Sequence, residues 1–388
     1  MSVTAAKGFV ASGVHCGVRK KERRDLALVR SLVPATGAGM FTANRVQAAP
    51  VTVCREHLEL AEPQAVVANS GVANAATGEQ GVVAARATAA EAAWLLGLKT
   101  EQVLVLSTGV IGAPLPLDKV LAGVRGAALQ LTGSGGGAAA EVIMTPDTRP
   151  KESVARGDGF TVGGMAKGSG MIHPNLATML AVVTTDYPLD PGEAIAFLRP
   201  AVGASFNAIS VDGECSTNDT VLLLANGASG IERTPASDER FALCLRKVCG
   251  ELAKQIVADG EGATVLAEIA VRGAASEPEA RAIAERVATS PLVKTALHGR
   301  DANWGRIASA AGSARYAGGY AQLDPDTLTI VIDGVPVFES GRPTGDEPTL
   351  ENGSCAIEID LALGDGAATY LTTDLSYDYV RINAEYRS

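Results

Sequence analysis

Residues 167–186 read KGSGMIHPNLATMLAVVTTD, and this stretch organises the rest of the fold. Its first half is a glycine-rich loop, which His173-Pro174-Asn175 turns because proline fixes φ and disfavours helix in the residue before it. From Thr178 the apolar, β-branched run TMLAVVTT is typical of a buried strand. Thr178 therefore lies where a loop enters a rigid strand that holds its hydroxyl in place. A threonine here also fits as a simple strand former.

The periodicity of the flanking sequence predicts a mixed α/β protein with layered sheets, flanking helices and a strand-rich C-terminal part. We expect helices at 81–96, 117–131, 191–206, 237–258 and 278–289. The first of them carries Trp94 and is predicted to pack in the core. Further strands are expected at 25–29, 37–41, 63–69, 103–106, 219–225, 264–271, 327–332, 335–339, 355–363 and 368–375.

Composition excludes several classes of protein. The chain has 388 residues, 47% hydrophobic and 20% charged, as in ordinary globular proteins. Its net charge of −10 argues against nucleic-acid binding, which depends on many phosphate contacts. We expect no membrane span, because no apolar run approaches about 18 residues. The N-terminal sequence lacks the basic and apolar segments of a secretion signal.

Cysteines and histidines are scattered along the chain. The six cysteines form no C-x-x-C pair, and the four histidines form no ligand cluster. We therefore expect reduced thiols, a cytoplasmic location and no metal site. Two glycine-rich segments, 133–138 and 163–169, lack the context or residue order of nucleotide-binding loops, and we interpret the first as a flexible connector.

The stretch MAKGSGMIHPNLATMLAVVTTD resembles the cleavage-site segment of the bifunctional ornithine acetyltransferase family, also called glutamate N-acetyltransferases. The resemblance continues in order through most of the chain. Its further segments are ANSGVANAATG (68–78), LSTGVIG (106–112), IMTPDT (143–148), DGECSTNDTVLLLANG (212–227), ADGEGAT (258–264), DANWGRI (301–307) and VRINAEYRS (380–388).

The resemblance implies a self-cleaving acyltransferase with an N-terminal-nucleophile-like fold. Cleavage between Ala177 and Thr178 would leave an α chain of residues 1–177 and a β chain of 178–388, with a C-terminal subdomain from roughly 272. Thr178 would then be the nucleophile, and its freed α-amino group, with a pKa near about 7.7–8.0, would be the base. The family also suggests an α2β2 heterotetramer.

Further site residues follow from matching positions. Thr108 and Gly109 provide a hydroxyl and a backbone N–H that could stabilise an oxyanion. The same pair also fits an ordinary turn at the end of a strand, with no catalytic role. The resemblance assigns substrate contacts to Thr145, Lys167, Glu261, Asn383 and Ser388. Pro146 stands where the family commonly has a threonine. Lys167 and Glu261 are expected in loops, where their charges suit a carboxylate and an ammonium group.

The reaction so implied moves acetyl from N2-acetyl-L-ornithine to L-glutamate by a ping-pong route in arginine biosynthesis, without a metal or organic cofactor. Some family members also accept acetyl-CoA, and the sequence leaves that donor open. Two alternatives stay open as well. An N-terminal-nucleophile amidohydrolase or aminopeptidase would share Thr178 but use water, and a catalytically silent binding homologue would keep the scaffold uncut.

Overall fold

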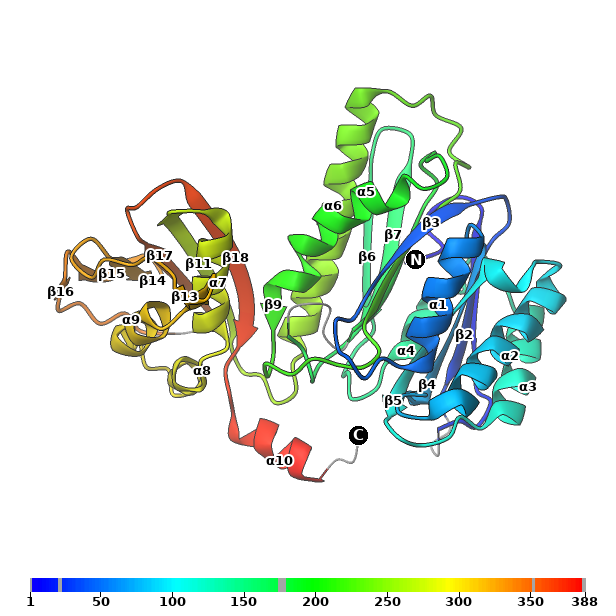
Figure 1. The fold of residues 1–388 in the computed structure, drawn as a ribbon, viewed down its shortest axis with the longest axis horizontal. Coiled ribbons are helices and arrows are strands. Elements are labelled where there is room, and N and C mark those ends of the chain that lie inside the picture. Colours follow the sequence, from blue (N-terminus) through cyan, green and yellow to red (C-terminus); the bar gives the residue numbers. More distant parts are fainter. Residues whose placement is uncertain (1, 20–22, 174–178, 351–352, 386–388) are drawn as a thin grey trace.

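Figure 1 shows the fold in a computed structural model, which describes residues 2–19, 23–173, 179–350 and 353–385. Three main sheets have helices packed on them, which confirms the predicted mixed α/β class.

The strand predicted after Thr178 is central to a five-stranded sheet. Its order is β3 (Thr36–Phe41), β10 (Thr220–Ala225), β8 (Leu180–Thr185), β7 (Thr161–Lys167) and β6 (Lys151–Arg156). Every residue of β8 and β10 is buried. Leu180 and Val182 face the core shared with a second sheet, whereas Ala181 and Val183 face α5 (Ala194–Gly203) and α6 (Pro235–Ala258). Burial on both faces explains the continuous apolar run.

The second sheet contains the N-terminal strands. Its order is β1 (Phe9–Val14), β2 (Leu26–Ser31), β4 (Ala65–Val72) and β5 (Val103–Val110). Its helices are α1 (Ala49–Leu60), α2 (Gly78–Leu96), α3 (Leu117–Leu129) and α4 (Gly136–Ile143). Helix α4 contacts strands of both sheets, and its apolar side chains belong to the core between them. The two sheets therefore share one hydrophobic core.

The C-terminal part forms the third sheet, as the strand-rich sequence predicts. Its order is β16 (Arg342–Pro343), β15 (Val335–Glu339), β14 (Thr329–Ile332), β17 (Ser354–Asp360), β11 (Leu266–Ala274), β18 (Gly366–Thr373) and β9 (Ile209–Ser210). Its helices are α7 (Glu277–Ala288), α8 (Pro291–His298) and α9 (Trp304–Gly312). A short hairpin, β12 (Arg315–Tyr316) and β13 (Gly319–Tyr320), follows α9. Helix α10 (Tyr377–Glu385) lies apart from this sheet (Figure 1).

Some predictions from composition are wrong. Residues 133–138 are not a flexible connector, because α4 begins at Gly136. A Cβ on Gly135 would lie 1.8 Å from the Ala11 carbonyl oxygen, so glycine is required where the chain crosses β1. The α2 helix packs in the core, but Trp94 itself is 76% exposed. Composition does not distinguish a packed glycine from a mobile one.

Several elements were not predicted. Among them are α1, α4, α8, α9, α10, β1, β6 and β7, and the two-residue strands β9, β12, β13 and β16. Most of them are short or rich in alanine and glycine, so their periodicity is weak, and tertiary contacts decide their structure.

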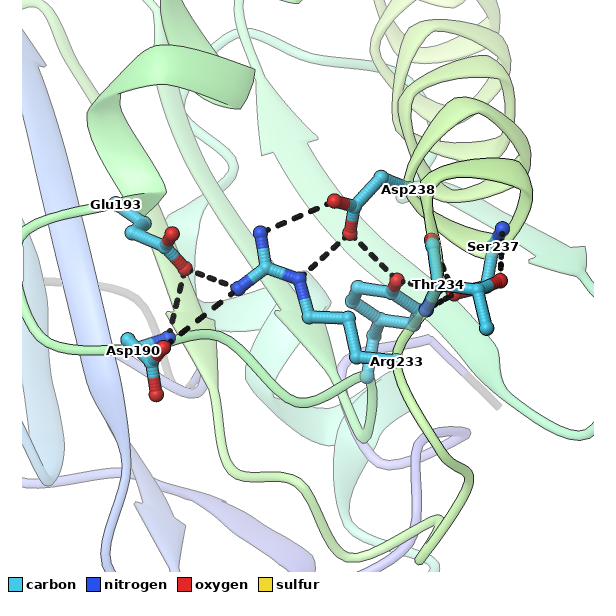
Figure 2. A network of polar contacts seen from close by, with 7 residues as sticks. Asp190, Glu193, Arg233, Thr234, Ser237 and Asp238 are labelled. Carbon is cyan, nitrogen blue, oxygen red and sulfur yellow. Dashed lines mark hydrogen bonds and ion pairs between the residues drawn. The ribbon is translucent and has the colours of Figure 1, made fainter.

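A polar network around Arg233 joins the starts of α5 and α6 (Figure 2). Its Nε lies 2.7 Å from Asp238 Oδ1 in the first turn of α6, and its Nη1 contacts Glu193, the residue before α5. The Tyr187 hydroxyl donates to the same Asp238 oxygen at 2.7 Å. Thr234 caps α6 by accepting from Ser237 N at 3.1 Å. This network fixes the two helices that cover the outer face of the central sheet.

Candidate active site

A cavity of about 80 Å³ lies where β5 and β7 end, near the turn after α6 and helix α10. The sequence-predicted residues that line it are Thr108, Gly109, Thr145, Lys167, Glu261 and Asn383. These residues come from segments far apart in the chain, so the tertiary fold brings them together. Ala177, Thr178 and Ser388 lie outside the described residues.

Thr108 and Gly109 lie within β5, which continues to Val110 beyond its predicted end. The pairing of β4 with β5 is irregular here, and Gly109 faces Gly71. Gly109 has a φ of +134°, and a Cβ on it would lie 2.3 Å from the Gly71 carbonyl carbon. Only glycine fits this position without displacing the backbone. The neighbouring Thr108 side chain is therefore presented to the cavity from a tightly constrained strand.

Asn218 holds this strand end from the other side of the cavity. Its Nδ2 donates to Ser107 O at 2.8 Å and to Ala73 O at 2.7 Å. The side chain is buried and itself lines the cavity. The sequence gives no signal for this role, because a single asparagine in a polar loop most often makes only local hydrogen bonds.

Lys167 is the last residue of β7 and not a loop residue, and only 2% of it is exposed. The prediction that Lys167 lies in a loop is therefore wrong. Burial lowers the pKa of Lys167, whereas the negative charges of Asp147, Asp219 and Glu261 act to raise it. Lys167 is also one of the residues that line the cavity. A buried cation of this kind suits an anionic ligand.

Glu261 lies in the turn after α6, as predicted, and is partly buried. Its N–H donates to Ser169 O at 2.7 Å. Burial raises the pKa of its carboxyl, although Asn383 Nδ2 donates to Oε2 at 2.8 Å and opposes that shift. A Cβ on Gly170 would lie 2.5–2.6 Å from the Glu261 carboxyl group, so glycine allows the carboxylate to approach that backbone.

Asp212 and Asp219 hold the chain on either side of residues 174–178. Asp212 accepts from Met171 N at 2.5 Å and Ile172 N at 2.8 Å, and the Tyr379 hydroxyl of α10 donates to it at 3.3 Å. Asp219 is fully buried and accepts from Met179 N at 2.9 Å. Burial raises the pKa of both carboxyls. The sequence DGECSTND, which contains both aspartates, does not by itself indicate that they bond to backbone N–H groups about forty residues earlier.

Thr145 is positioned by a neighbouring aspartate. Its N–H donates to Asp147 Oδ2 at 2.8 Å, and Asp147 Oδ1 accepts from Gly168 N at 2.7 Å and from the buried Lys151 ammonium at 2.6 Å. Asp147 and Lys151 were not predicted as site residues.

Within residues 2–19, 23–173, 179–350 and 353–385, no cluster of His, Cys, Asp and Glu side chains is suited to a metal ion. Over the same residues, no helix has both the length and the apolar character needed to cross a membrane.

Comparison with known proteins gives consistent matches along the whole chain. The sequence profile of the ArgJ family matches residues 10–388. The arginine biosynthesis bifunctional protein ArgJ of Symbiobacterium thermophilum is 48% identical over 400 residues, covering 100% of this chain and 98% of the relative. That of Mycolicibacterium paratuberculosis is 48% identical over 397 residues, covering 100% and 96%.

A solved structure of ornithine acetyltransferase from Mycobacterium tuberculosis, complexed with ornithine, is 43% identical. It covers 45% of this chain and 94% of that chain, with a TM-score of 0.44. The family match over nearly the full length and the identity to these relatives lead to one conclusion: this chain belongs to the ArgJ family.

Proposed function

We propose that this ArgJ-family protein is a self-processed acetyltransferase that moves acetyl from N2-acetyl-L-ornithine to L-glutamate in arginine biosynthesis. One observation supports the site most directly. Residues from β5, the loop after α4, the end of β7, the turn after α6 and helix α10 line one cavity, and they are the residues predicted from the sequence. Within this cavity, a buried lysine and a partly buried glutamate offer one charge of each sign to an amino-acid substrate.

The reaction has two half-reactions. In the first, Thr178 Oγ attacks the acetyl carbonyl carbon while its own α-amino group takes the hydroxyl proton. The carbon–nitrogen bond of the acetamide then breaks, the proton passes to the leaving nitrogen, and ornithine departs. In the second, the amino group of glutamate attacks the acetyl-threonine ester, which releases N-acetylglutamate and restores the hydroxyl.

Thr108 and Gly109 would stabilise the oxyanion of each tetrahedral intermediate, with the threonine hydroxyl and the glycine N–H as donors. The constrained backbone of β5 supports this role, because preorganised donors do not have to be reoriented during the reaction. Lys167 would bind a substrate carboxylate, and Glu261 a substrate ammonium group. Thr145, Asn383 and Ser388 would complete the substrate contacts.

The nucleophile would arise by cleavage of the Ala177–Thr178 bond. The threonine hydroxyl attacks the Ala177 carbonyl carbon, and water then opens the resulting ester. The chains of 1–177 and 178–388 would assemble as α2β2, and the β chain would carry a C-terminal subdomain from roughly 272. We place the reaction in the cytoplasm and assign it no metal or organic cofactor. Acetyl-CoA stays an open alternative donor.

The deciding experiment measures ornithine release from N2-acetylornithine with glutamate absent and present, beside N-terminal sequencing of the purified protein. We expect a new N-terminus at Thr178 and multiple turnovers only with glutamate. Equal turnover without glutamate would instead identify an amidohydrolase. An uncut chain without turnover would identify a silent binding homologue.

A further inference from the structure

A buried ion cluster lies directly behind the cavity. Lys151, at the start of β6, is fully buried, and its ammonium lies 2.6 Å from Asp147 Oδ1 and 2.6 Å from Asp259 Oδ2. Burying an unpaired ammonium is strongly unfavourable, so the two carboxylates are what make this lysine possible. The cluster joins the loop before β6 to the C-terminal end of α6, more than one hundred residues away.

The backbone contacts of this cluster lead to the cavity. Asp147 accepts from Thr145 N and from Gly168 N, the residue after Lys167. Asp259 accepts from Thr148 N at 3.0 Å and from the Thr148 hydroxyl, and it lies two residues before Glu261. The cluster is therefore bonded to, or directly adjacent to, each of the three segments that carry Thr145, Lys167 and Glu261 to the cavity.

The charges of the cluster do not cancel. One lysine and two aspartates leave one net negative charge, and Lys167 is the cation beside it. The charged groups that act on Lys167 are Asp147 from the loop before β6, Lys151 from β6, Asp219 from the start of β10 and Glu261 from the turn after α6. Of these charges, Asp147 acts most strongly. Burial removes water from the Lys167 ammonium and so disfavours its charged form. The nearby Asp147 carboxylate favours the charged form and so compensates for this loss of hydration.

We propose that Asp147 is a positioning residue of the site, which with Lys151 and Asp259 fixes the Thr145 and Lys167 segments and keeps Lys167 cationic for a substrate carboxylate. The proposal rests on the proposed function, because Lys167 matters here as the substrate-binding cation. Asp147 itself lies outside the cavity lining and acts through its neighbours.

The test compares variants that remove one charge each. Asp147→Asn removes the negative charge beside Lys167, so the basic limb of the pH profile of kcat/KM should move to lower pH, by about one unit. KM should rise by about tenfold or more at pH 8, since a charge-assisted contact is weakened. Lys151→Met removes a positive charge, so the same limb should move to higher pH. Lys151→Met therefore tests the effect of nearby charges on the pH profile independently, in case Asp147→Asn does not fold.

Asp259→Asn is the matched control. It removes one carboxylate charge from the same cluster, but Asp259 bonds to Lys151 and Thr148, whereas Asp147 bonds to the N–H of Gly168, next to Lys167. It should lower the melting temperature and leave the basic limb in place. A purely structural role predicts that the three variants lose activity at every pH with no opposite shifts, and that result would overturn the proposal. If the wild-type protein transfers no acetyl, or Lys167→Ala keeps wild-type KM, the proposed function has failed instead.

Discussion

The clearest test of how the scaffold supports catalysis is Asn218→Ala. This change removes the amide that donates to Ser107 O and Ala73 O; Ser107 lies within β5, Ala73 directly follows β4, and both residues are buried. Each buried acceptor left without a partner costs about 1–3 kcal/mol. Allowing for partial hydration of the space left behind, we expect the free energy of unfolding to fall by about 2–4 kcal/mol.

The same change should impair the chemical step. Ser107 directly precedes Thr108, so a freed strand end would misplace the oxyanion donors. We expect kcat to fall by at least about tenfold, with KM changing less, because the loss affects the transition state more than substrate binding. The assays are denaturant unfolding and steady-state kinetics with both substrates.

Asn226→Ala provides the control. Asn226 is also a buried asparagine, and its Nδ2 donates to Lys7 O at 3.0 Å and Ser31 Oγ at 3.1 Å, but it does not line the cavity. It should lose comparable stability and keep its kcat. If Asn218→Ala unfolds at the wild-type denaturant midpoint, or if both variants lose kcat equally, the assigned role of Asn218 is wrong.

Three further predictions concern other parts of the chain. Thr178→Ala should stay a single uncut chain on a denaturing gel, whereas Thr178→Ser, which keeps a hydroxyl, should still be cleaved; cleavage of the alanine variant at the same bond would contradict the mechanism. Arg233→Ala should lower the free energy of unfolding by about 1–2 kcal/mol, since the network in Figure 2 is partly solvated, with kcat/KM at the wild-type value. A change in kcat/KM would place Arg233 in the catalytic machinery. Burial acts to raise the pKa of Asp147, but Lys167 and Lys151 outweigh it and lower it to about 2. Its stabilising contribution should therefore be complete above about pH 4 and lost as the pH falls towards 2, and Asp147→Asn should flatten this part of a plot of unfolding free energy against pH.

Sequence periodicity predicted the elements that are buried on both faces or strongly amphipathic. The apolar runs of β8 and β10 and the long helix α6 were placed to within a few residues. The sequence pattern of such segments reveals the element directly, because burial restricts the buried positions to apolar residues. Helices α1 and α4 lacked that signal, and α4 was mistaken for a connector because glycines stand at its start, where Gly135 packs against β1 and Gly136 lies close to Ser2 and Thr4.

For the candidate site, resemblance in short motifs was enough to name six of the residues that line the cavity, namely Thr108, Gly109, Thr145, Lys167, Glu261 and Asn383. The tertiary structure alone decided that these residues converge, that Lys167 is buried, that Asn218 joins the cavity lining and that Asp147, Lys151 and Asp259 lie behind it. The physical reason is that the energy of a buried charge or amide depends on its partners. Here those partners lie as many as 108 residues away for Lys151 and 145 for Asn218, a separation over which local sequence patterns carry no information.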